Sequence, residues 1–242
     1  MLNLVSTTGL ATALGIYTTS ASLAHNYYTR AATDAATGIV ARAGRHSGDV
    51  GVLFGDTAAE TKQKAVDMRS KGFKAIKFGW GPFGTTTVQA DAEHIFAARD
   101  GIGDDGYLMI DAGTVFKEDV EAAAARLPAL HEANVYWYEE PFDGYAISSY
   151  AQLSARTPKV ALAGGEGAHN AYQGRQLIDD GKVGFIQIDA GYVGGISNAY
   201  QIAQYANKKG VKYVNHTFTS QSALSSSLQS FAGLAESDIS EY

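Results

Sequence analysis

The stretch GFIQIDAGYVGGISNAYQIAQYANKKGVKYVNH, residues 184–216, contains one complete strand–helix–strand unit. Its two ends, GFIQID and VKYVNH, are short runs rich in the β-branched and aromatic residues that favour strands. The middle, GISNAYQIAQYANKKG, has helical periodicity and closes with two lysines and Gly210, as helix C-termini commonly do. Two strands joined by a helix pair in parallel. The unit therefore predicts a parallel sheet covered by helices.

The same alternation runs through most of the chain. Further strand candidates are DVGVLF (49–54), FKAIKF (73–78), YLMID (107–111), VYWYE (135–139), VALAGGE (160–166) and the short DISEY (238–242). Further helix candidates cover 57–72, 88–103, 118–134 and 171–181. Eight strand signals in regular succession, with no G-x-G-x-x-G after the first, favour a TIM-like (β/α) barrel over an open dinucleotide-binding sheet. We predict an α/β barrel at 49–242, incomplete at its last strand, and leave residues 1–48 unassigned.

Composition excludes several classes of protein. The chain has 242 residues and a formal net charge of −6, without the basic stripe that nucleic-acid binding needs. Cysteine is absent, so a metal ion would have to be held by carboxylates or histidine. No apolar run is long enough to span a membrane, and the apolar N-terminal segment lacks the preceding positive charge of a signal peptide. We expect a cytoplasmic protein with no nucleic-acid or membrane partner.

Polar side chains stand at the ends of five consecutive predicted strands: Asp111, Glu139, Glu166, Asp189 and His216. In a barrel, the carboxyl ends of the strands converge on one face. Each residue alone has a structural explanation, as a helix cap, an ion-pair partner or a hydrogen-bonded core histidine. Three carboxylates meeting at one face, however, would repel one another strongly unless a cation neutralised them. Ligands that are all oxygen suit Mg²⁺ first and Mn²⁺ second.

This succession resembles the barrel domain of the enolase superfamily, and within it the mandelate racemase/muconate lactonizing enzyme-like branch. The resemblance runs from about residue 50 to 242. It rests on the order of the motifs, which are a lysine on the second strand, Glu-Glu-Pro at 139–141, Gly-Gly-Glu at 164–166, and the later Asp and His. The resemblance implies three metal ligands, Asp111, Glu139 and Glu166, and four catalytic residues, Lys77, Asp189, His216 and Glu241. Glu140 would then point to the other side of its strand.

The resemblance also implies a reaction, namely abstraction of the proton next to the carboxylate of a small-molecule substrate. We expect a Mg²⁺-dependent lyase that eliminates water from an acid sugar in carbohydrate catabolism. The alternatives are a racemase or cycloisomerase of the same branch, or a non-catalytic barrel fragment. Family members carry an N-terminal capping domain and continue beyond the final strand, and we expect both parts to be missing here. Activity of this chain alone is therefore left open, and a full-length chain would form a homo-oligomer.

Two lysines lie three residues apart in KAIKFGWGPFG, residues 74–84. Because strand side chains alternate between faces, Lys74 and Lys77 cannot both face the barrel mouth. The family pattern has lysines two apart, and alignment on Gly79 gives Lys77 the second position and Ala75 the first. With no neighbouring ammonium to lower its pKa, Lys77 is expected to stay protonated and to hold the substrate. Proton transfer would then fall to His216 and its partner Asp189, with Glu241 donating a hydrogen bond.

Overall fold

A computed structural model of the chain describes residues 41–42, 46–218, 220–231, 234 and 239–241. Within these ranges the strands are β1 (Ala41–Arg42), β2 (His46–Leu53), β3 (Ala75–Gly79), β4 (Tyr107–Asp111), β5 (Trp137–Glu139), β6 (Ala161–Gly164), β7 (Phe185–Asp189), β8 (Lys212–His216) and β9 (Ile239–Glu241). The helices are α2 (Ala58–Ser70), α3 (Val88–Ile102), α4 (Val120–Ala124), α5 (Leu127–Glu132), α6 (Ile147–Ser154), α7 (Ala171–Asp179), α8 (Ile196–Lys209) and α9 (Gln221–Phe231).

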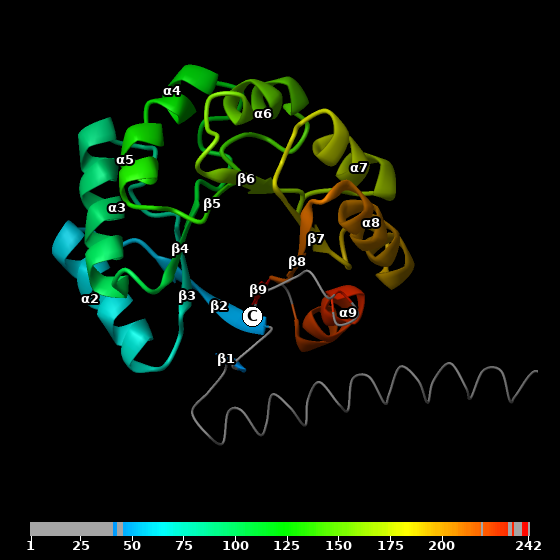
Figure 1. Cartoon of the computed structure of the whole chain (residues 1–242), viewed down its shortest axis with the longest axis horizontal. Coiled ribbons are helices and arrows are strands. Elements are labelled where there is room, and N and C mark those ends of the chain that lie inside the picture. The colour runs from blue at the N-terminus through cyan, green and yellow to red at the C-terminus, as the bar shows by residue number, and fades with distance from the viewer. Residues whose placement is uncertain (1–40, 43–45, 219, 232–233, 235–238, 242) are drawn as a thin grey trace, which may run out of the picture.

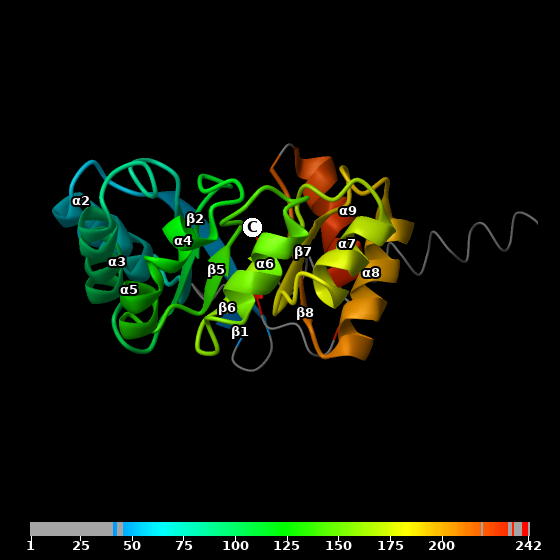
Figure 2. The ribbon, with the colours of Figure 1, turned by 90° about the horizontal axis from the view of Figure 1, so that it is seen from above.

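All these strands belong to one sheet, whose order follows the chain from β1 to β8. The pairs from β2 to β8 are parallel, and β1 adds an antiparallel pair with β2. The sheet curls with the helices on its outside, as Figures 1 and 2 show. β9 pairs in parallel with β2, and the Asn215 side chain of β8 donates to the Glu241 carbonyl at 2.8 Å. The predicted barrel is confirmed; among the described residues no ladder joins β8 to β9, so it is incomplete there.

Side chains alternate between the two faces of each strand, so the sheet has one apolar cluster on each face. Toward the helices the strands present the larger apolar cluster, which includes Ile76, Ile110, Leu162 and Ile188. Toward the barrel axis, β3 to β9 each contribute one residue to a second cluster: Ala75, Met109, Trp137, Ala163, Phe185, Val214 and Ile239.

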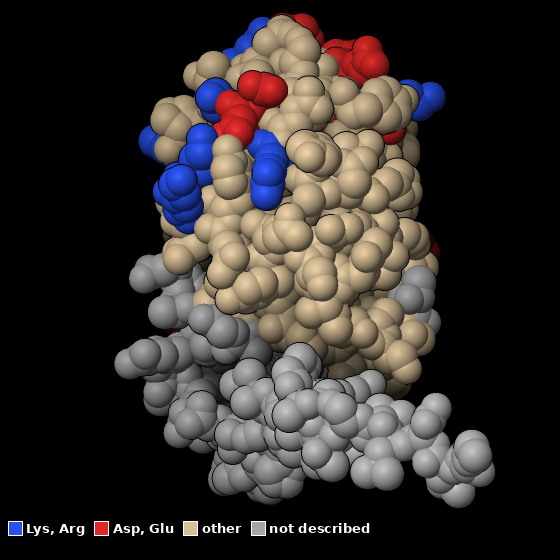
Figure 3. Space-filling view, turned by 90° about the vertical axis from the view of Figure 1, so that its right-hand side faces the viewer, with Lys and Arg blue, Asp and Glu red and all other residues tan. Residues whose placement is uncertain are grey.

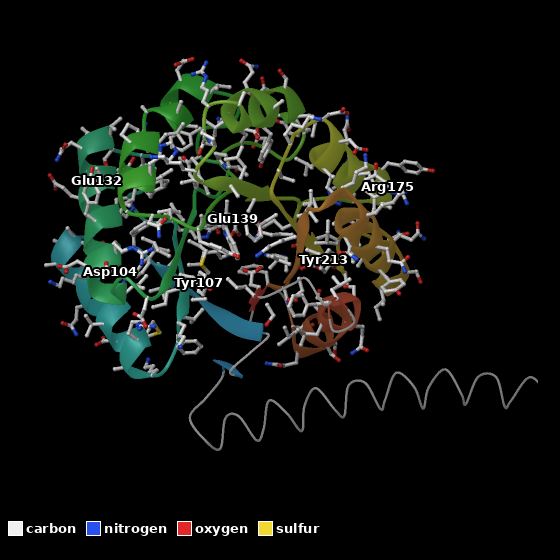
Figure 4. All side chains as sticks on the ribbon, in the orientation of Figure 1. Asp104, Tyr107, Glu132, Glu139, Arg175 and Tyr213 are labelled. Carbon is white, nitrogen blue, oxygen red and sulfur yellow. The ribbon has the colours of Figure 1, made fainter. Side chains whose placement is uncertain are left out.

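Because side chains repeat their face every two residues, the next inward residues lie one step closer to the carboxyl ends. On five of the strands these residues are Lys77, Asp111, Glu139, His216 and Glu241. Figure 4 shows Glu139 within the curve of the sheet, whereas Glu132 and Arg175 lie on the outer helices. The inner apolar cluster thus forms the layer beneath a polar layer at the barrel mouth.

Several boundaries differ from those expected. The first long strand starts at His46 rather than Asp49, so it extends into the segment left unassigned. The helix expected at 118–134 is two helices, and Pro128, which has no N–H to donate, stands at the start of the second. Helices α6 and α9 are not among the helix candidates named from the sequence; both are rich in serine, a weaker helix former. Residues 1–40 lie outside the described part, so the division at residue 48 stays a prediction.

The surface over α8 and α9 carries few charged side chains, and those visible gather at one end of this face (Figure 3). An ion pair between Lys209 and Asp179, 2.7 Å long, links α8 to α7. In the described part of the chain, none of the helices has the length and apolar character that crossing a membrane demands.

Candidate active site

Lys77 lies on the inner face of β3 and is buried, whereas Lys74 is exposed, as strand alternation predicts. Its ammonium donates to Glu139 Oε1 at 2.6 Å and to Glu241 Oε1 at 2.6 Å. Asp111 Oδ2 is 3.9 Å away. Lys77 therefore contacts carboxylates from three other strands, and Glu241 accepts one of its hydrogen bonds. The role of Glu241 as a donor to the substrate stays a prediction.

His216, at the end of β8, lies between two carboxylates. Its Nδ1 is 3.0 Å from Asp189 Oδ2, and its Nε2 is 3.2 Å from Glu166 Oε2. Burial lowers the pKa of His216, but the hydrogen bond with Asp189 raises it. The negative charges of Glu241 and Glu166 raise it further, so that the pKa of His216 is about 9. At neutral pH the imidazole in this arrangement is therefore the positively charged form, with a proton on each ring nitrogen.

Asp189 is fixed in place by its own neighbours. Its Oδ1 accepts hydrogen bonds from the backbone N–H groups of Gly191 at 2.6 Å and Tyr192 at 3.3 Å. Burial raises the pKa of Asp189, but the hydrogen bonds from His216 and Gly191 outweigh burial and leave the pKa below its usual value. Asp189 is therefore ionised and sets both the orientation and the charge of the imidazole.

The carboxylates at the mouth repel one another. Burial, and then the charge of Glu139, raises the pKa of Asp111 to about 8, while Lys77 acts in the opposite direction. Burial, and then the charge of Glu140, raises the pKa of Glu166 to about 8. A carboxyl group whose pKa is raised by its neighbours' charges would be stabilised as an anion by a nearby cation.

The side of the strand to which the Glu140 side chain points stays a prediction, but its backbone does not continue the strand. Strand alternation predicts this side chain on the opposite side from Glu139, but β5 ends at Glu139 and Glu140 has a φ of 35°. Its buried carboxylate accepts a hydrogen bond from the Gly165 N–H at 3.1 Å. Gly165 has a φ of 115°, and a Cβ there would lie 2.7 Å from the side chain of Ile186. Glu140 thus contacts the turn that carries Glu166, and sequence reasoning missed this role.

Among the residues described, no group of three or more Asp, Glu or His side chains is arranged to hold a metal ion as it stands. Instead, Lys77 Nζ lies 2.6 Å from Glu139 Oε1, and His216 Nε2 lies 3.2 Å from Glu166 Oε2. The donor chemistry nevertheless fits a hard divalent cation, because Asp111, Glu139 and Glu166 follow adjacent strands, offer only oxygen and repel one another. Their ligand role remains a prediction.

Comparison with known proteins shows the family to which the chain belongs. The sequence model of the family described as enolase C-terminal domain-like matches residues 60–242. The chain belongs to this family. The crystal structure of a predicted mandelate racemase from Rhodobacter sphaeroides is 52% identical, with a TM-score of 0.78, and the match covers 84% of this chain and 52% of that one.

Two curated relatives are named for reactions of sugar acids or of a sugar-acid lactone. D-galactarolactone cycloisomerase from Agrobacterium fabrum is 31% identical over 181 residues, which are 74% of this chain and 46% of that protein. L-talarate/galactarate dehydratase from Salmonella typhimurium is 34% identical over 154 residues, or 64% of this chain and 37% of that protein. The chain thus spans less than half the length of these two relatives.

Proposed function

We propose that this chain is the catalytic barrel of a Mg²⁺-dependent dehydratase that eliminates water from an acid sugar. The observation that carries the proposal is the pairing of His216 with both Asp189 and Glu166 at the mouth of the barrel. This pairing combines an oriented acid/base group with one of three strand-end carboxylates. The dehydratase among the relatives supports the choice of reaction and of substrate class.

Asp111, Glu139 and Glu166 would hold the Mg²⁺, or Mn²⁺ in its place. The ion would supply positive charge next to the substrate carboxylate, where negative charge develops when the neighbouring C–H bond breaks. Lys77, already within 3.9 Å of Asp111, would place a second positive charge there. A buried ammonium with several hydrogen-bond donors suits binding of a carboxylate oxygen.

His216 would act first as the general base and then as the general acid. As a neutral imidazole it takes the proton from the carbon next to the carboxylate, and the electron pair of that C–H bond forms a C=C bond to the neighbouring carbon. The C–O bond on that carbon breaks, and the departing hydroxide takes the proton from His216 and leaves as water. The enol that remains becomes a 2-keto acid. Neutralising Glu166 would remove one contribution that raises the pKa of His216, which favours the neutral starting form.

The test is incubation of the chain with an acid-sugar library in D₂O with Mg²⁺, followed by detection of keto acids. A keto-acid product that disappears in His216→Asn supports the dehydratase. Deuterium exchange at the carbon next to the carboxylate without keto acid would instead indicate a racemase. Conversion of a sugar-acid lactone without loss of water would indicate a cycloisomerase, the reaction named for one relative. Mg²⁺ binding with no turnover would indicate a non-catalytic barrel. A homo-oligomer of the full-length protein stays a prediction.

A further inference from the structure

We infer that Trp137 is a positioning residue for Glu139, holding its carboxylate in the orientation in which it would ligate Mg²⁺. The metal part of this inference rests on the proposed function. The two residues are two apart on β5, so their side chains share the inner face of the strand. The indole Nε1–H of Trp137 donates to Glu139 Oε2 at 2.7 Å, and both residues are 0% exposed.

The surrounding core determines the direction of this N–H. The Trp137 ring lies in the inner apolar cluster, with its centroid 5.0 Å from that of Phe185 and 5.8 Å from that of Tyr136. A fully buried indole has only two side-chain torsions, and close packing leaves it no alternative rotamer without a rearrangement of its neighbours. Core packing therefore fixes the donor, and the donor fixes one oxygen of the carboxylate.

The other oxygen of Glu139 has a different kind of partner. Glu139 Oε1 accepts from Lys77, whose ammonium is also bonded to Glu241. A lysine ammonium sits on a flexible four-carbon chain and has three donors, so it can shift toward Glu241 when a cation approaches Glu139. The indole cannot move in this way. Since a carboxylate oxygen has two acceptor sites, Glu139 can keep the Trp137 bond while it ligates an ion.

A simpler reading is that Trp137 only fills the core and that its N–H is satisfied by the nearest acceptor. Phe185 separates the two readings, because it belongs to the same cluster and contacts the same ring but has no polar atom on its side chain. Loss of packing alone would affect Trp137→Phe and Phe185→Leu alike. Loss of a bond that orients a ligand would affect Trp137→Phe only.

The first measurement is the Mg²⁺ affinity of the chain by titration calorimetry, with circular dichroism to confirm folding. Partners that orient metal ligands commonly contribute about 10–100-fold in affinity, so Trp137→Phe is expected to bind Mg²⁺ at least about 10-fold more weakly than wild type. Phe185→Leu is expected to lower the unfolding temperature and to keep the wild-type affinity. Equal affinities of Trp137→Phe and wild type, or equal losses in both variants, would overturn the inference.

The second measurement requires no metal. The chain has two tryptophans, Trp137 and the 58% exposed Trp80, and therefore two indole N–H signals in a ¹⁵N-labelled NMR spectrum. Glu139→Gln is expected to move the Trp137 signal upfield, because a neutral amide is a weaker acceptor than a carboxylate. Glu132→Gln, on the outer helix α5, should leave both signals in place. An unmoved Trp137 signal in Glu139→Gln would refute the positioning role.

The two measurements separate failure of this inference from failure of the proposed function. If wild type and Phe185→Leu bind no Mg²⁺, the proposed metal role is wrong, and the NMR result decides whether Trp137 orients Glu139. If wild type and Phe185→Leu both bind Mg²⁺ but the Trp137 signal does not move in Glu139→Gln, the proposed function stands and the positioning role is wrong.

Discussion

His216 Nε2 lies 3.2 Å from Glu166 Oε2, so the proposed acid/base residue pairs directly with a proposed metal ligand. This contact connects the predicted acid/base residues with the predicted metal ligands, two sets that were described separately from the sequence. Any cation that binds Glu166 competes with this ion pair and removes negative charge from the surroundings of the imidazole. Metal binding and the protonation of His216 are therefore linked in the proposed enzyme.

Mg²⁺ is expected to raise the melting temperature of wild type but not of Glu166→Gln. At a hundredfold excess over its dissociation constant, a ligand adds about 2.7 kcal/mol of stability, or roughly 5–10 °C for a chain of this size. The matched control is Glu132→Gln, an exposed carboxylate on α5 that should respond like wild type. Differential scanning calorimetry measures the shifts. Equal shifts in wild type and Glu166→Gln would exclude Glu166 as a ligand.

The metal-free protein is expected to lose stability as the pH rises from about 4 to 9, first through the two carboxyl groups and then also through the imidazole. The pKa values of Asp111 and Glu166 are raised to about 8 and that of His216 to about 9. A group whose folded pKa is raised contributes stability below its unfolded pKa and loses it as the pH passes the folded value, on the order of 1 kcal/mol per pH unit for each group. Urea unfolding in a chelator measures this, and Asp111→Asn should flatten the slope. A stability that rises over this range would contradict the electrostatics described for the site.

Asp189→Asn is expected to lower the pKa of His216, because it removes the charged hydrogen-bond partner that raises it. If the chain has the proposed activity, turnover should fall by about 10²–10⁴-fold, the range typical of lost acid/base function. NMR titration of the imidazole signals measures the pKa, and the exposed His169 provides an internal control. An unchanged pKa of His216 would show that the dyad does not form in solution.

Glu140→Ala is expected to weaken Mg²⁺ binding more than Glu140→Gln. Glutamine keeps an oxygen that can accept the Gly165 N–H, whereas alanine leaves that buried donor without its partner, which costs about 1–3 kcal/mol. Denaturant unfolding and Mg²⁺ calorimetry on both variants measure the two effects. If alanine and glutamine behave alike, the bond to Gly165 does not position the turn that carries Glu166.

Much of the polar layer could be predicted because it depends on local rules. Period-two alternation and strand ends place Lys77, Asp111 and Glu139 on one face, and barrel closure brings their strands together. The role of Glu140 could not be predicted, since its positive φ ends the alternation and its partner, Gly165, lies 25 residues away. The bond from Trp137 depends on a side-chain orientation that the core sets and that no spacing rule encodes.

The hydrogen bond between Lys77 and Glu241 joins residues 164 positions apart in the sequence. Glu241 lies on β9, which pairs with β2. A ribosome delivers β2 to β8 in the order in which they lie side by side, so each strand can add to the one before it. Lys77 can meet Glu139 during this growth, but its second carboxylate arrives only after residue 241 has been added. The charge balance around Lys77 thus depends on β9, and a chain that stops before β9 would leave this ammonium with one fewer carboxylate.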